Sequence, residues 1–214
     1  MTHYITGDET YQLPFGRHRT FLAAIPLWEE ELIGGWAISG VTEWHTGIAW
    51  GNNANAFDAG YSNDAPGILI GSPAAVATHL TKIPGGGVNV FNAAPATASQ
   101  PYSALAAASA YEGPIGFQVG SRNSLRGPHY FNQDLGLAKT FPIYAERVNL
   151  KFRADAFNAF NHPNFDLPIE NVYNGFDNQD FTNPSFGQIT DTISPAGNLN
   201  NGARVLQVAL RLEF

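Results

Sequence analysis

The residues best suited to chemistry in this sequence are charged side chains that recur at every second position in two stretches. They are Lys151, Arg153, Asp155, Arg211 and Glu213. If the two stretches form neighbouring antiparallel strands, these charges share one face, where they could steer a charged ligand or pair with one another. Pairing is the commoner outcome for opposite charges on adjacent strands, so we expect ion pairs here.

Patterns typical of catalysis or metal binding do not occur in the sequence. The six histidines show no spacing of two or four residues, and the chain has no cysteine. It has neither a Gly-x-Ser-x-Gly elbow nor a His-Glu-x-x-His helix. We therefore expect a protein that is not an enzyme and that uses no metal or cofactor.

Composition narrows the class of protein further. The chain has 214 residues and a formal net charge of −7, which argues against a nucleic-acid partner. Charged residues make up 14% of the chain, a low share for a water-soluble domain. No stretch of about 18 apolar residues occurs, so we expect no transmembrane helix.

The last ten residues show the clearest pattern, because their polarity alternates strictly. The apolar members are Leu206, Val208, Leu210, Leu212 and Phe214. Successive side chains of a strand point to opposite faces, so such a strand meets an apolar medium on one face and a polar medium on the other. Its length matches the roughly 9–11 residues with which a tilted strand crosses a bilayer.

Weaker alternation predicts four more strands. With the terminal strand, the ranges are about residues 2–13, 36–48, 129–141, 147–160 and 205–214. Long connections at residues 51–123 and 161–203 alternate with a short turn at residues 142–146, and we expect short helices at residues 27–33 and 103–111. We predict an all-β, antiparallel, up-and-down transmembrane β-barrel segment of about five strands with two long external loops.

Aromatic residues fall near the predicted strand ends, as they do in the aromatic belts that anchor barrels at both membrane interfaces. One belt would include Trp36, Phe141 and Phe214, and the other would include Trp44, Trp50, Tyr130 and Phe160. A water-soluble core would also bury such rings. The apolar positions that continue along whole strands favour the belts.

Several segments, in order, carry a resemblance to a known family. They are Tyr11-Gln-Leu-Pro-Phe-Gly16, Gly34-Gly-Trp-Ala-Ile-Ser-Gly40, Ser121-Arg-Asn-Ser-Leu-Arg-Gly-Pro128, Phe152-Arg-Ala-Asp-Ala-Phe-Asn-Ala-Phe-Asn-His-Pro-Asn-Phe165, Ser185-Phe-Gly-Gln-Ile-Thr190 and the terminal Leu-Arg-Leu-Glu-Phe. Together they resemble the C-terminal part of Oar-like TonB-dependent outer-membrane receptors, which are abundant in Acidobacteria. The resemblance covers nearly the whole chain apart from the loop tips.

The resemblance implies a place and a set of partners. Such receptors lie in the outer membrane of Gram-negative bacteria and bind or import a ligand with energy delivered through TonB. It implies that residues 1–214 form the final strands of a barrel of roughly 22 strands. The implied partners are outer-membrane lipid, the remaining strands and plug of the parent receptor, and the barrel-assembly machinery, which would read Phe214; TonB would act only through the upstream part.

The first residues of the chain show no basic region followed by an apolar one, so no signal peptide is expected. We therefore expect a C-terminal fragment of a longer receptor, without plug or signal peptide, that does not transport by itself. Two alternatives remain open. One is a soluble β-sandwich that binds a carbohydrate, and the other is a small complete barrel, which would need at least about eight strands.

Overall fold

The structure is a computed structural model that describes residues 1–54, 65–84, 87–92, 105–116, 118, 120–144, 148–173, 182–193 and 202–214. The chain divides into two compact units. The strand unit comprises residues 3–45, 130–164 and 193–214. The loop unit comprises residues 1–2, 46–129 and 165–192. The described fold is all-β with little helix.

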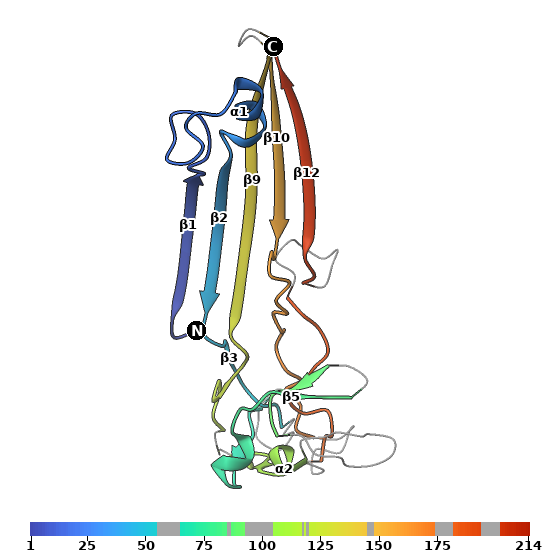
Figure 1. Cartoon of the computed structure of the whole chain (residues 1–214). Helices are drawn as coiled ribbons and strands as arrows, with labels where there is room; N and C mark the ends of the chain where they lie inside the picture. Colours follow the sequence, from blue (N-terminus) through green and yellow to red (C-terminus); the bar gives the residue numbers. More distant parts are fainter. Residues whose placement is uncertain are drawn as a thin grey trace. The chain divides into compact units, whose positions relative to one another are not determined.

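The strand unit is built on one five-stranded antiparallel sheet with the order β1-β2-β9-β10-β12. Its strands are β1 (Tyr4–Gln12), β2 (Ala37–His45), β9 (Tyr130–Tyr144), β10 (Val148–Phe157) and β12 (Val205–Glu213). Each strand lies beside the one that precedes it along the chain in this sheet, which is up-and-down topology (Figure 1). Each of the five ranges expected from the sequence overlaps one of these strands.

A single short helix, α1 (Leu27–Ile33), lies in the connection between β1 and β2. Pro26 precedes it, and Glu29 and Glu30 lie in its first turn, where negative charge is favourable beside the free backbone N–H groups. Gly34 ends it and donates its N–H to the carbonyl of Glu30 over 2.9 Å. The sequence placed this helix correctly.

The register gives the sheet two faces of different character. On one face, Leu150, Phe152 and Ala154 of β10 lie opposite Leu212, Leu210 and Val208 of β12 and opposite residues of β9. On the other face, Lys151 lies opposite Arg211, and Asp155 lies opposite Gln207. We call these the apolar face and the polar face. The alternation read from the sequence therefore becomes two surfaces that continue across several strands.

The elements that the structure describes in the loop unit are all short. They are β3 (Ala49–Trp50), β4 (Ile68–Leu69), a 3₁₀ turn η2 (Pro73–Val76), β5 (Thr81–Lys82), β6 (Val88–Asn89), α2 (Leu105–Ala108), β7 (Tyr111–Glu112), β8 (Leu125–Arg126) and β11 (Gln188–Ile189). They pair as β11-β6-β5, β3-β8 and β4-β7. The helix expected at residues 103–111 is present as the shorter α2.

A hydrophobic core holds the loop unit together. Phe91 and Phe186 are fully buried, and their ring centroids lie 5.0 Å apart. Trp50 packs on both rings, at 6.0 Å and 5.9 Å. Gly187 has a φ of +76°, and a Cβ at this position would collide with the ring of Phe91, so glycine serves both the turn and the packing.

This core adds to one expectation and corrects another. Residues 51–123 and 161–203 were expected to be long connections, and their described parts supply most of a packed unit. Trp50 was expected in an aromatic belt, but it is buried in this core, because aromatic residues distant in sequence enclose it. Of the residues that the structure describes, none belongs to a helix long and apolar enough to cross a membrane.

Candidate functional site

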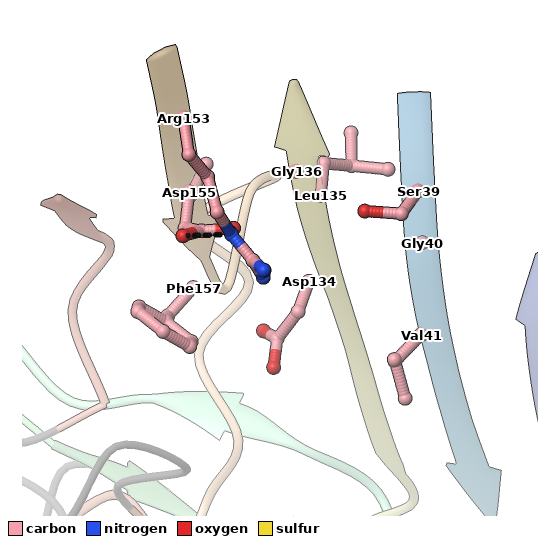
Figure 2. Close-up of a pocket in the computed structure, with 10 residues that line it drawn as sticks. Ser39, Gly40, Val41, Asp134, Leu135, Gly136, Arg153, Asp155 and Phe157 are labelled. Atoms are coloured by element: carbon pink, nitrogen blue, oxygen red, sulfur yellow. Dashed lines mark hydrogen bonds and ion pairs between the residues drawn. The ribbon is translucent and has the colours of Figure 1, made fainter. Parts of the chain in front are cut away.

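A small hollow of about 150 Å³ lies in the polar face of the strand unit. Residues of β2, β9 and β10 line it, among them Ser39, Val41, Asp134, Arg153, Asp155 and Phe157. Figure 2 shows that the Arg153 side chain passes beside the Asp155 carboxylate and enters the hollow. Its outer nitrogens point toward the side where Asp134 lies. Two of the five charged residues expected to share a face therefore meet in one site.

The hollow exists because Gly136 has no side chain. This residue lies opposite Ser39 of β2 and opposite Asp155 of β10 in the register. A Cβ at Gly136 would lie 2.7 Å from Ser39 Oγ and 2.9 Å from Asp155 Oδ1, closer than carbon normally approaches oxygen. Glycine at the centre of the sheet thus lets the two polar side chains approach each other.

Charge in the hollow is largely paired. Arg153 Nε donates to both carboxylate oxygens of Asp155, over 2.9 Å and 2.8 Å. The Asp134 carboxylate accepts hydrogen bonds from the backbone N–H of Asn158 (2.9 Å) and from the side-chain amide of Asn132 (3.0 Å). These contacts hold both carboxylates in fixed orientations, and the outer nitrogens of the Arg153 guanidinium still face the hollow.

A second set of charged side chains lies on the same face, nearer the C-terminal end of β12. Lys151 and Arg211 lie directly opposite each other, an arrangement of like charges that is unfavourable by itself. Glu213 pairs with both of them, at 2.9 Å from Lys151 Nζ and 3.3 Å from Arg211 Nε. All five charged residues singled out in the sequence therefore lie on one face, in ion pairs.

The aromatic residues expected at one end of the sheet meet on the apolar face. The ring centroid of Trp36 lies 6.2 Å from that of Phe141 and 5.8 Å from that of Phe152. Lys139, only 5% exposed, places its ammonium 4.8 Å from the Phe141 ring and 5.5 Å from the Trp36 ring. It also donates to the Glu30 carbonyl of α1 over 3.4 Å. Sequence reasoning missed this lysine, although its position among the apolar residues of β9 was a signal.

At the other end the expected belt divides between the two faces. Trp44 lies opposite Phe131, whose ring stacks at 6.3 Å on Phe160. Tyr130 instead stacks on His45 of the polar face, with ring centroids 4.9 Å apart. Adjacent residues of a strand point to opposite faces. Tyr130 therefore does not share the face of Trp44, and its assignment to the same belt is corrected.

One polar cluster crosses the apolar face. Glu9 of β1 accepts a hydrogen bond from the Gln133 amide of β9 over 3.2 Å, and Thr42 of β2 donates to Gln133 Oε1 over 2.6 Å. The Glu9 side chain reaches β9 by passing over Gly40. A Cβ on Gly40 would collide with the Glu9 carboxylate. This cluster gives one carboxylate oxygen of Glu9 a hydrogen-bond partner on a face that is otherwise mainly apolar.

Phe214, the expected assembly signal, directly follows β12 and is 98% exposed. No group of histidine and acidic residues in the described part of the chain could hold a metal ion.

A five-stranded up-and-down sheet with one apolar and one charged face is the arrangement found in a segment of a β-barrel wall. Residues 1–207 match the family model described as "Outer membrane beta barrel domain". The chain belongs to this family, and the sequence prediction of an outer-membrane barrel is confirmed at that level. A comparison with curated proteins and a comparison with solved structures each found no match.

Proposed function

We propose that the chain forms wall and closure strands of a TonB-dependent, Oar-like receptor that binds or imports a ligand across a Gram-negative outer membrane. In this proposal the apolar face contacts lipid, and the polar face with Lys151, Arg153, Asp155, Arg211 and Glu213 lines the lumen. The proposed partners are lipid, further barrel strands, a plug and the barrel-assembly machinery. We propose no enzymatic role.

The single observation that carries the proposal is the exposure of the apolar side chains of β12. Leu206 is 71% exposed and Leu210 is 66% exposed. In water, a continuous apolar surface of this kind would be covered by a second layer, as in a β-sandwich. In lipid it requires no cover. A groove of about 370 Å³ between Ile38, Leu137, Ala154 and Val208 is of a size to take acyl chains.

The sheet edges support the same proposal. In the described sheet, β1 and β12 are the outer strands and pair on one side only. An unpaired strand edge in hydrocarbon leaves backbone groups without partners, at several kcal/mol each. Further strands that close the barrel would remove both edges, which is the reason to propose a larger barrel rather than a five-stranded one.

The absence of cysteine makes the proposal directly testable. Single cysteines introduced along β12 in the vesicle-inserted protein would carry an environment-sensitive fluorophore. We expect lipid-soluble quenchers to act at positions 206, 208, 210 and 212, and water-soluble quenchers to act at positions 207, 209 and 211. Equal quenching at all seven positions would contradict a membrane-spanning strand.

The receptor role needs a separate test in cells. Deletion of Phe214 from the parent receptor should lower the amount of folded protein in the outer membrane, because the assembly machinery would lose its signal. A Phe214→Tyr variant keeps an aromatic terminus and is the matched control. Ligand uptake that continues unchanged without TonB would contradict the TonB-dependent part of the proposal.

A further inference from the structure

The connection between β1 and β2 exposes many apolar side chains at one end of the strand unit. Helix α1 lies in this connection, and Figure 1 shows it at the end of the sheet where β12 finishes. The exposed apolar side chains of the connection are Phe15, Phe21, Leu22, Leu27, Trp28, Leu32 and Ile33. Exposed apolar side chains that gather in one segment, rather than occurring singly, mark a surface that contacts a partner or a membrane.

Helix α1 directs large apolar side chains outward and holds an acidic side chain against the protein. Trp28 and Leu32, one helical turn apart, are 64% and 61% exposed. On the protein side, the Glu30 carboxylate accepts the backbone N–H of Arg17, and a Cβ at Gly34 would collide with this carboxylate. A helix on the surface of a water-soluble domain has the opposite polarity. The outer side of α1 therefore suits a partly apolar medium better than water.

Two hydrogen bonds attach α1 to the apolar face of the sheet. Trp36 Nε1 donates to the Leu32 carbonyl over 2.9 Å, and Lys139 Nζ donates to the Glu30 carbonyl over 3.4 Å. Trp36 and Lys139 both lie beside the Phe141 ring on that face. Helix α1 is therefore joined to the same face of the sheet that is proposed to contact lipid.

Lys139 gives a reason for α1 to remain at this place. An ammonium group on a lipid-facing surface is unfavourable unless other groups of the protein satisfy it. The Glu30 carbonyl of α1 accepts from Lys139, and the rings of Trp36 and Phe141 lie under its charge. Trp36 directly precedes β2, and Phe141 lies near the end of β9. Aromatic rings at strand ends mark the headgroup region of a membrane, so α1 is attached at that depth.

The charge of the connection indicates which lipid surface suits it. Residues 13–36 contain two arginines and three glutamates. Arg17, Arg19 and Glu31 are exposed, so the surface carries both signs of charge. A segment of nearly balanced charge gains little from an anionic surface, whereas Trp and Leu gain from the boundary between headgroups and acyl chains. A phospholipid with a zwitterionic headgroup therefore matches this segment.

We propose that α1 lies in the headgroup region of the phospholipid leaflet at this end of the barrel, with Trp28 and Leu32 inserted as an anchor. The leaflet is the periplasmic one. At this end β9 stops at Tyr144 and β10 starts at Val148, and outer-membrane barrels have their short connections on the periplasmic side. The inference rests on the proposed function, in which the sheet crosses the membrane, and adds a second contact with lipid outside the strands.

The test is depth-dependent quenching with the full chain inserted in phosphatidylcholine vesicles. A single cysteine, Leu27→Cys, carries the fluorophore, because Leu27 is exposed on α1 and this substitution keeps both anchor residues. Nitroxide lipids place the quencher either near the headgroup or at the end of the acyl chain. We expect the headgroup-level nitroxide to quench position 27 more strongly. Val208→Cys on β12, labelled in the same way, should show the reverse order.

Variants identify the anchor. The double substitution Trp28→Ser with Leu32→Ser should remove lipid quenching at position 27 and expose the probe to a water-soluble quencher. The matched control is Ile70→Ser with Ile115→Ser, which removes two exposed apolar side chains of the loop unit. It should leave quenching at position 27 unchanged. Alternating quenching along β12 verifies in each variant that the sheet has folded.

The lipid composition tests the role of charge. Replacement of part of the phosphatidylcholine by anionic phosphatidylglycerol should leave quenching at position 27 unchanged. Lipid quenching that occurs only with the anionic lipid would contradict a zwitterionic surface as the partner.

Three further results would overturn the inference: neither lipid quencher acts at position 27, the deep nitroxide acts more strongly there, or the control variant loses as much quenching as the α1 variant. A probe shielded from both lipid and water would show that protein, such as a second copy of the chain, covers α1 instead.

Failure of this inference is distinguishable from failure of the proposed function. Alternating quenching along β12 without lipid quenching at position 27 would reject only the docking of α1. Lipid quenching at position 27 with uniform quenching along β12 would reject only the membrane-spanning strands.

Discussion

The two units of this protein place their apolar side chains in opposite ways. In the strand unit, Leu206, Val208, Leu210 and Leu212 are all exposed along one face of β12. In the loop unit, Phe91 and Phe186 are fully buried, and the polar groups form the surface of a cavity. The same chain therefore contains one region suited to an apolar medium and one region suited to water.

The comparison shows which physical force stabilises each unit. Burial away from water provides most of the stability of a water-soluble core. A lipid-facing strand gains little from apolar contact with neighbours, and its stability depends on complete backbone pairing. Substitution of buried side chains by smaller ones should therefore destabilise the loop unit. Charges introduced on the apolar face should destabilise the strand unit.

The largest effect is expected from Phe186→Ala. The fully buried ring of Phe186 lies 5.0 Å from Phe91 and 5.9 Å from both Trp50 and Tyr111. Its removal should cost the loop unit about 3–5 kcal/mol, measured by hydrogen exchange of its buried amides. Leu210→Ala in micelles is the control, and loss of protection in the loop unit with this variant would contradict the comparison.

A charge on the apolar face should have the next largest effect. Val208→Arg should cost about 2–4 kcal/mol if Val208 lies near the bilayer midplane. Gln207→Arg, one residue away on the polar face, should leave the free energy of unfolding nearly unchanged. Folding titrations with urea in lipid vesicles measure both variants. Equal costs would mean that the two faces do not meet different media.

A side chain at the centre of the sheet should have a moderate effect. Gly136→Val would bring a Cβ to within 2.7 Å of Ser39 Oγ and 2.9 Å of Asp155 Oδ1. We expect a loss of about 1–3 kcal/mol from overpacking, measured by the same titration. Gly7→Val is the matched control on β1, because no atom lies within 4 Å of its Cβ position. A comparable loss there would show that the hollow is not the cause.

The smallest effect concerns pH and is confined to the loop unit. Burial raises the pKa of Tyr111 above its ordinary value of about 10, although interactions with Ser124 and Asn52 partly oppose the shift. Because the folded pKa exceeds the unfolded pKa, this contribution to stability is complete below about pH 10 and is lost as pH rises through the folded pKa. Urea unfolding between pH 9 and pH 12 should show a decline that Tyr111→Phe reduces.

Part of the fold could be predicted because its signals are local. A period of two lies in neighbouring residues, so residues 205–214 indicated both the strand and its two faces. The shared face of the five charged residues followed from the same period. The end of helix α1 followed from Gly34 and Gly35 after it. The hollow at Gly136 could not be predicted, because it depends on which residues of β2 and β10 lie opposite that glycine.

The sequence by itself determined the strands, the polarity of their faces and the length of their connections, since each depends on residues close together in the chain. Only the tertiary structure decided that Trp50, Phe91 and Phe186 form one core, that Tyr130 stacks on His45, and that Lys139 contacts helix α1. These residues have no common period and are far apart in the chain. Their contacts arise only when irregular segments pack, and no local preference specifies that packing.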